Sequence, residues 1–264
     1  DRSAMVATHF LGIDVGSSYT KFAAIDNSRH IDHVAVIPTL SRCREEYSRT
    51  MEEIGDKFAI GRICATGYGR QQVESDLQKT ELVCASAGVS FHHPVHKCII
   101  DIGGEDIKVI ESDASGNVVK FFMNDKCSAG TGTFVTEIAE RAELDLAEMS
   151  PLSRKSTSDR IINSFCTVFA KSEILGWKFS GVPIEDIARG IYLSIVDRVR
   201  KLPVKKGFPV FLCGGVIAFH PVLAELMAER IQSNIQVVTQ PQFVIALGAA
   251  VLAQKDALRA PATR

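Results

Sequence analysis

Two stretches of the sequence alternate between apolar and polar positions in the same way, IDVGSSYTKFAAI near the start and IDIGGEDIKVI further on. In each, an aspartate, a β-branched residue and a glycine are followed, after four more residues, by a lysine; the ranges are 14–21 and 101–108. The flanking β-branched and apolar residues favour strands. Each stretch therefore predicts a strand-turn-strand hairpin, one opening each half of the chain.

Both predicted turns carry glycine, at Gly16 and at Gly103-Gly104. We expect a positive φ at these positions and a bare backbone that a ligand can approach. Either hairpin alone is common, but the pair suggests an internal duplication in which the two turns face one another across a cleft. Turn amides from both sides then cradle phosphate oxygens, while Asp14 and Asp101 hold a hydrated Mg²⁺.

A third glycine site follows a third apolar run. The range 210–213 predicts a short buried strand, which Gly214-Gly215 interrupts. Apolar residues then recur at helical spacing over 222–231, so the double glycine stands at a strand-to-helix junction. Small residues there allow an adenine ring or a ribose to lie against the backbone, although such a junction is more often purely structural.

Length and composition limit the possible classes of protein. At 264 residues the chain exceeds one usual domain, so we expect two lobes. Hydrophobic residues make up 46% and charged residues 23%, and a formal net charge of -1 gives no electrostatic case for a nucleic-acid partner. No apolar run reaches the roughly 18 residues of a spanning helix, and the start DRSAMVATHF lacks the apolar core of a signal peptide. We therefore expect a cytoplasmic protein with no membrane partner.

The chain has seven cysteines, and none of them forms a C-x-x-C pair. An odd number in a chain of this length predicts reduced thiols rather than a disulfide framework. Cys64, Cys98 and Cys213 lie in apolar runs and are predicted to be buried as small apolar side chains. Cys43 and Cys84 are given no role.

Cys127 and Cys166 differ from the others, because each stands in a short polar stretch just ahead of a predicted helix, in NDKCSAGTGTF and INSFCTVFAKSEI. The unpaired amides of a first helical turn stabilise a thiolate, or a metal-thiolate cluster with net negative charge. A purely structural role for the two cysteines carries equal weight on this chemistry alone.

Four further features are interpreted more simply. FHHPVHK, with histidines at 92, 93 and 96, is interpreted as the linker between lobes rather than a metal site. Pro183 opens a predicted helix that runs to about Leu202, with acidic residues in its first turn. Trp177 is expected to pack or to meet a partner. Lys108 is as readily a solvated strand residue as a site residue.

The order of two Asp-x-Gly hairpins, a Thr-rich glycine turn and a late Gly-Gly resembles the actin, Hsp70 and sugar-kinase superfamily of ATPases. The Walker and dinucleotide-binding glycine patterns are absent from the expected positions. The resemblance implies a duplicated actin-like (ribonuclease H-like) α/β fold with the nucleotide cleft between its lobes. The first lobe is expected over 1–95, completed by a C-terminal helix in 245–264, and the second lobe, carrying the cluster cysteines, over 96–244.

A narrower resemblance covers residues 10 to 255. LGIDVGSSYTK, ATGYGR, DIGGEDIKVI, NDKCSAGTGTF, CTVFAKSEI and CGGV together resemble the activase family that serves 2-hydroxyacyl-CoA dehydratases and ATP-dependent benzoyl-CoA reductases. In that family a 4Fe-4S cluster sits on a two-fold axis between subunits, each giving two cysteines. The corresponding residues are Cys127 and Cys166, so the resemblance implies a dimer with an identical chain or with a related ATPase subunit.

Residue roles follow from combining the two hairpins with this resemblance. Asp14 and Asp101 are expected to bind Mg²⁺ or orient water, and Glu105, where many activases have glutamine, is a candidate base. The residues expected to bind ATP or ADP are Gly16, Ser17, Ser18, Lys21, Gly103, Gly104, Gly130, Thr131, Gly132, Gly214 and Gly215. The segment 128–132 would then link the cluster ligand to the phosphates, so that nucleotide state and electron delivery share a hinge.

The resemblance implies an ATP-hydrolysing iron-sulfur component that passes low-potential electrons to a CoA-ester-reducing partner, with a ferredoxin-type donor. The preferred form is a subunit of an ATP-dependent benzoyl-CoA-type reductase. The alternative is a freestanding activator of a 2-hydroxyacyl-CoA dehydratase. A more distant alternative is a sugar or acyl kinase of the same fold, in which both cysteines would be incidental.

Overall fold

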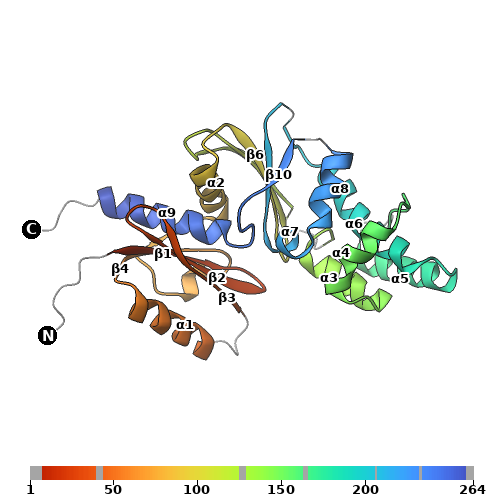
Figure 1. Ribbon diagram of the computed structural model, residues 1–264, viewed down its shortest axis with the longest axis horizontal. Coiled ribbons are helices and arrows are strands. Elements are labelled where there is room, and N and C mark those ends of the chain that lie inside the picture. Colours follow the sequence, from red (N-terminus) through yellow and green to blue (C-terminus); the bar gives the residue numbers. More distant parts are fainter. Residues whose placement is uncertain are drawn as a thin grey trace, which may run out of the picture. The chain divides into compact units, whose positions relative to one another are not determined.

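A computed structural model describes residues 8–39, 44–124, 129–162, 166–205, 207–231 and 234–259. The chain divides into two compact units (Figure 1). The first unit contains residues 1–95, 112–119 and 242–264, and the second contains residues 96–111 and 120–241. Among the described ranges, no helix has both the length and the apolar character that crossing a bilayer demands.

The first unit is built on a five-stranded sheet with the order β3-β2-β1-β4-β5. Its strands are β1 (His9–Val15), β2 (Tyr19–Asp26), β3 (Ile31–Pro38), β4 (Ile60–Thr66) and β5 (Leu77–Gln78). β1, β2 and β3 form antiparallel pairs, whereas β4 runs parallel to β1 and β5 parallel to β4. The first predicted hairpin is therefore confirmed, and its register pairs Asp14 with Lys21.

Helices cover both faces of this sheet. They are α1 (Arg44–Lys57), the 3-10 turn η2 (Arg70–Gln72), α2 (Glu81–His92) and α9 (Val244–Arg259). Alternate residues of β1, Leu11 and Ile13 among them, pack with Ile54 of α1 in one apolar cluster. The opposite face receives α9, where a Cβ atom at Gly12 would lie 1.9 Å from the Ala246 carbonyl oxygen. Glycine on this face thus lets the backbone of α9 approach the strand directly.

The second unit repeats the same topology. Its strands are β6 (Lys97–Ile102), β7 (Ile107–Ser112), β8 (Val118–Asn124), β9 (Val210–Cys213) and β10 (Ile235–Val237), in the order β10-β9-β6-β7-β8. β6 and β7 form the second predicted hairpin, while β9 runs parallel to β6 and to β10. Strand for strand, β6 to β10 correspond to β1 to β5, which is the structural form of the duplication that the two hairpins predict.

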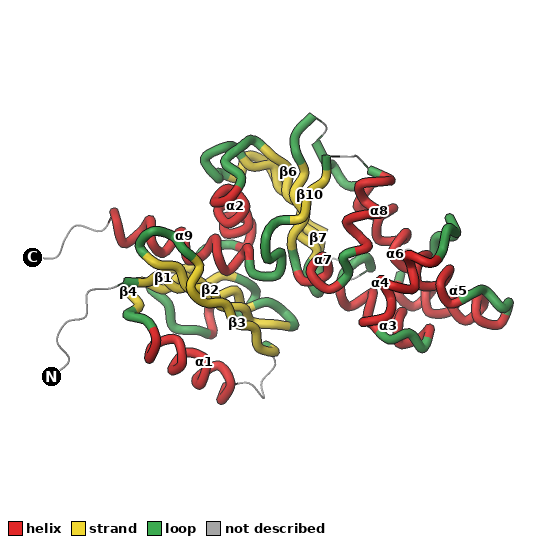
Figure 2. Tube along the Cα trace, in the orientation of Figure 1, coloured by secondary structure: helices red, strands yellow, loops and turns green. Residues whose placement is uncertain are grey.

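Six helices of the described residues belong to the second unit (Figure 2). They are α3 (Gly132–Ala142), α4 (Leu146–Lys155), α5 (Thr167–Phe179), α6 (Ile184–Arg200), α7 (Gly215–Phe219) and α8 (Val222–Arg230). α6 confirms the helix predicted after Pro183, with Glu185 and Asp186 in its first turn. Trp177 of α5 packs against this helix, because a Cβ atom at Gly190 would lie 2.6 Å from its ring.

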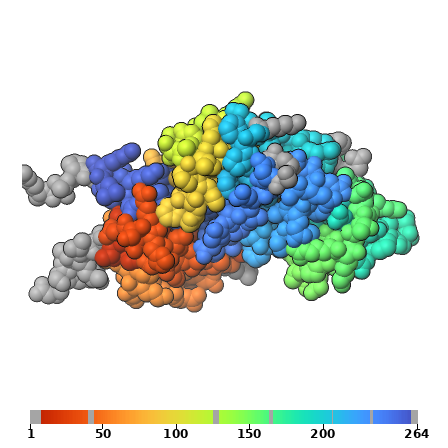
Figure 3. Space-filling view, turned by 45° about the horizontal axis from the view of Figure 1, so that its top comes forward, coloured from red at the N-terminus to blue at the C-terminus, as the bar shows by residue number. Residues whose placement is uncertain are grey.

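The connection between β7 and β8 belongs to the first unit, although both strands pair within the second sheet. Ser86 of α2 lies 2.6 Å from the Ser112 hydroxyl and donates a hydrogen bond to the Gly116 carbonyl oxygen at 2.9 Å. Figure 3 shows the yellow-green surface of this connection beside the yellow surface of α2. A buried hydroxyl pair therefore ties the connection to α2.

Candidate functional site

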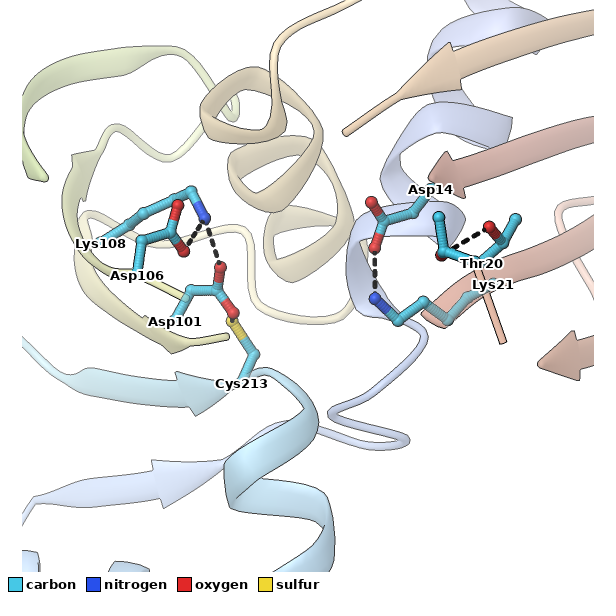
Figure 4. A network of polar contacts seen from close by, with 8 residues as sticks. Asp14, Thr20, Lys21, Asp101, Asp106, Lys108 and Cys213 are labelled. Carbon is cyan, nitrogen blue, oxygen red and sulfur yellow. Dashed lines mark hydrogen bonds and ion pairs between the residues drawn. The ribbon is translucent and has the colours of Figure 1, made fainter. Parts of the chain in front are cut away.

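The first hairpin places an aspartate and a lysine side by side at the end of β1. Lys21 Nζ donates a hydrogen bond to Asp14 Oδ2 at 3.1 Å (Figure 4). Asp14 is only 2% exposed, and its Oδ1 atom is buried with no hydrogen-bond partner among the described residues. In the turn that follows, Ser17 is half-buried and Ser18 is exposed. One carboxylate oxygen is thus neutralised by lysine, and the other is unpaired, as a ligand of a hydrated cation would be.

The second hairpin carries a denser charge network. Lys108 Nζ donates to Asp106 Oδ1 at 2.6 Å and to Asp101 Oδ2 at 3.4 Å (Figure 4). All three residues are buried, so the interpretation of Lys108 as a solvated strand residue is wrong. This cluster has two carboxylates and one ammonium group, whereas the first hairpin has one carboxylate and one ammonium group. An unbalanced carboxylate in a buried site favours a further cation.

Sequence reasoning missed Asp106. The sequence does contain a cue: Asp106 stands two positions before the lysine of the second repeat, and the first repeat has Tyr19 at the equivalent position. The main chain of Asp106 also closes the turn, because Gly103 N donates to its carbonyl oxygen at 3.0 Å.

The predicted positive φ at Gly16 and Gly103-Gly104 is wrong. The glycines with positive φ in the described residues are 67, 116, 130, 181, 207 and 214. Gly16 N donates to the Tyr19 carbonyl oxygen at 3.2 Å, so this turn closes without a left-handed glycine. Space explains the residue type instead: a Cβ atom at Gly16 would lie 2.9 Å from that same oxygen, and one at Gly103 would lie 3.1 Å from Asp106 Oδ1.

Positive φ occurs instead at two equivalent glycines, which follow the strands parallel to β1 and β6. Gly67 follows β4 with φ 92°, and Gly214 follows β9 with φ 100°. A Cβ atom at Gly67 would lie 2.8 Å from Asp14 Oδ1, and one at Gly214 would lie 2.5 Å from Asp101 Oδ1. A glycine therefore lies directly against each aspartate, and any other residue at that position would strain the backbone.

Gly214 confirms the predicted strand-to-helix junction, and Gly215 begins α7. Sequence reasoning assigned no role to Gly67. The signal that would have identified it was Thr66-Gly67 after an apolar run, which matches Cys213-Gly214 after another.

The Thr-rich glycine turn joins the second hairpin. Gly132 N donates to the Gly103 carbonyl oxygen at 3.0 Å, and Thr133 N donates to the Gly104 carbonyl oxygen at 2.9 Å. Glu105 Oε1 accepts a hydrogen bond from the Thr133 hydroxyl at 2.7 Å. Thr131 is buried at the N-cap of α3, and Gly130 has φ 91°. The structure thus brings the predicted residues 103–105 and 130–132 together, with Gly214 beside Asp101.

Four cysteines of the described residues are buried. They are Cys64, Cys84, Cys98 and Cys213, so the prediction of burial for the first, third and fourth is confirmed. Cys213 donates a weak hydrogen bond to Asp101 Oδ1 at 3.8 Å. Burial, reinforced by the negative charge of Asp101, raises the pKa of the Cys213 thiol well above its usual value. This thiol is therefore protonated, and it is a poor metal ligand.

Cys166 has different surroundings. It is the N-cap residue of α5, with extended backbone angles, and its side chain makes no capping hydrogen bond to the helix. It is partly exposed, and the next turn exposes Phe169 to 70%. Cys127 lies outside the described residues, and within those residues no three His, Cys, Asp or Glu side chains are grouped to hold a metal ion. Two cysteines per chain would supply half of the four ligands that a 4Fe-4S cluster commonly takes.

The repeated sheet, with an Asp-Gly hairpin in each copy, defines an ATPase of the actin-like fold class, as expected from the sequence. The chain belongs to the BadF/BadG/BcrA/BcrD ATPase family, which matches residues 11–253. It is 37% identical to the 2-hydroxyisocaproyl-CoA dehydratase activator of Clostridioides difficile, over 94% of this chain and 95% of that protein. The structure of that activator with bound ADPNP has a TM-score of 0.85 over 95% of this chain and 96% of that one.

Two other relatives bear on the function. The (R)-2-hydroxyglutaryl-CoA dehydratase component A of Acidaminococcus fermentans has a TM-score of 0.86 and 34% identity, over 96% of this chain and 100% of that one. A benzoyl-CoA reductase subunit of Thauera aromatica is more distant, at 24% identity over 84% of this chain and 83% of that protein. Membership of this ATPase family indicates that the nucleotide is ATP. None of these relatives is a sugar or acyl kinase, so they do not support the kinase alternative.

Proposed function

We propose that this protein is a freestanding, ATP-driven activator of a 2-hydroxyacyl-CoA dehydratase. The observation that carries the proposal is near-full-length similarity to dehydratase activators at 34–37% identity, against 24% for a benzoyl-CoA reductase subunit. This reverses the preference for a reductase subunit that the sequence motifs suggested. A CoA-ester dehydratase is then the partner, and a ferredoxin-type protein is the proposed electron donor.

Nucleotide binding is assigned to the two buried hairpins. Asp14 and Asp101 hold hydrated Mg²⁺, while Lys21 and the main chain of the 16–18 turn contact phosphate oxygens. The amides of 103–104 and 130–132 are likewise assigned to phosphate oxygens. Phosphoryl transfer of this kind depends mostly on positioning and charge neutralisation, and both hairpins supply these.

Coupling between nucleotide and electron transfer is assigned to the joined turns of the second unit. Two main-chain hydrogen bonds fasten Gly132 and Thr133 to Gly103 and Gly104, so a shift of the phosphate turn moves the first residues of α3. Cys127 stands two positions before Ala129 in the sequence. Cys127 and Cys166 of two chains would hold a 4Fe-4S cluster, which would supply a low-potential electron. ATP then acts by favouring one of two states of this linked segment.

A reconstituted activation assay tests the proposal. The anaerobically purified protein, given ATP and a reduced ferredoxin, is expected to activate a 2-hydroxyacyl-CoA dehydratase and to fail with the core subunits of a benzoyl-CoA reductase. Omitting ATP, or replacing it with ADPNP, is expected to abolish repeated activation. Efficient reduction of the reductase core with no dehydratase activation would overturn the assignment.

Glu105 is proposed to orient the attacking water rather than to remove its proton. One carboxylate oxygen is held by the Thr133 hydroxyl, which fixes the side chain at the turn. A glutamine amide can orient water equally well but cannot act as a base. We therefore expect Glu105→Gln to keep most of the ATPase activity, whereas Glu105→Ala lowers kcat by about a hundredfold. Steady-state phosphate release measures both variants, and equal losses would assign proton removal to Glu105.

A further inference from the structure

A cavity of 250 Å³ lies within the first unit. Its walls come from α2, α9, the turn between β2 and β3, and the connection between β7 and β8. β2 carries the chain from the 16–18 turn to this cavity over eight residues, which at about 3.3 Å per residue spans about 25 Å. The cavity is therefore separate from the candidate phosphate turn of the same unit.

The polar lining of the cavity is cationic. Arg29 and Lys255 line it, together with the hydroxyl-bearing Ser90 and Ser115, and no aspartate or glutamate of the described residues does. Ser90 Oγ is buried with no hydrogen-bond partner in the described part of the chain. Within those same residues Lys255 has no ion pair or hydrogen bond. A buried hydroxyl and an ammonium group left without partners are suited to receive an anion.

The arginine of this site is held in place by the fold. Arg29 has φ 67°, a conformation unfavourable for a residue with a side chain. Gln254, buried in α9, accepts a hydrogen bond from Arg29 Nε at 2.7 Å and donates to the Asn27 carbonyl oxygen at 2.9 Å. The strained turn is thus fastened to the helix that carries Lys255. Such preorganisation lowers the entropy cost of binding a ligand.

The apolar lining limits the anion further. Phe91 and Val251 face the same cavity as the two cations. A cavity of about 150 Å³ accepts benzene and drug-sized ligands need about 300 Å³ or more, so 250 Å³ suits a body of intermediate size. We infer that the first unit binds a small organic carboxylate, with its carboxylate between Arg29 and Lys255 and its apolar body against Phe91 and Val251.

Calorimetric titration of the full chain with benzoate and with 4-methylpentanoate tests the inference, and benzamide is the neutral control. Both acids are expected to bind and benzamide is not. Arg29→Gln and Lys255→Gln are each expected to weaken binding about tenfold or more, because each removes a charge-assisted hydrogen bond. Lys155→Gln, at an exposed lysine of α4, is expected to have no effect.

A second pair of variants adds a negative charge at the cavity instead of removing a positive one. Ser115 is exposed on the β7–β8 connection, so Ser115→Asp introduces a negative charge at the cavity without altering the core. Ser115→Asp is expected to abolish binding of both acids, while Ser115→Asn retains it. Equal binding by these two variants overturns the inference, as does equal binding of benzoate and benzamide, or tighter binding of inorganic phosphate than of either acid. ATPase activity is not part of the readout, so failure here is distinct from failure of the proposed function.

Discussion

Asp101→Asn is expected to lower ATP hydrolysis by about a hundredfold or more and to raise the Mg²⁺ concentration needed for half-maximal rate. The substitution keeps the shape of the side chain but removes the negative charge that we propose binds Mg²⁺. Lys108 retains Asp106 as a partner at 2.6 Å, so the buried ammonium group is not left unpaired. Phosphate release measured over a range of Mg²⁺ concentrations gives both quantities.

Two matched variants separate charge at the metal from charge in the network. Asp106→Asn keeps the Asp101 side chain and is expected to reduce the rate less than Asp101→Asn, because Lys108 then pairs with Asp101 alone. Asp56→Asn, on the exposed side of α1, is expected to behave as the unmodified protein. A rate for Asp101→Asn within a few-fold of normal, in a protein that melts normally, contradicts the assignment of this residue.

Cys166→Ser is expected to remove nearly all bound iron from a protein that otherwise carries about two iron atoms per chain, half of a shared 4Fe-4S cluster. Serine lacks the soft thiolate that iron-sulfur clusters require. Nucleotide binding is expected to persist, since Cys166 lies at the start of α5 and not on either hairpin. Anaerobic iron analysis and EPR with and without ATP measure the loss, and Cys127→Ser is expected to behave in the same way.

Cys98→Ala is the matched control for this experiment. Cys98 is buried in β6, and burial raises the pKa of its thiol to about 11, so it does not form a thiolate near neutral pH. Iron content and the EPR signal are expected to be unchanged in this variant. Should iron and the signal survive in both the Cys166 and the Cys127 variants, the ligands lie elsewhere and the cluster assignment is wrong.

Local sequence patterns were sufficient to predict individual strands and helices. Both hairpins, the strand β9 and the helix α6 were predicted, because alternation and helical spacing report on neighbours within a few residues. The backbone of the turns was predicted wrongly. Gly16 and Gly103 were expected to need positive φ, yet each turn closes by a hydrogen bond back to its own start. Glycine is required at these positions because the Tyr19 carbonyl oxygen and the Asp106 carboxylate lie close to where a Cβ atom would be. Residue preferences for turns do not predict the positions of these atoms.

By itself, the sequence determined the duplicated hairpin, its aspartate-lysine spacing and the family to which the chain belongs, since these depend on residue type and on short separations along the chain. Only the tertiary structure decided that Lys108 is buried between two aspartates, that Gly67 and Gly214 lie directly against Asp14 and Asp101, and that Gly132 is bonded to Gly103. Most of these contacts join segments far apart in the chain. Their distances are set by the packing of strands and helices, which periodicity along the chain does not encode.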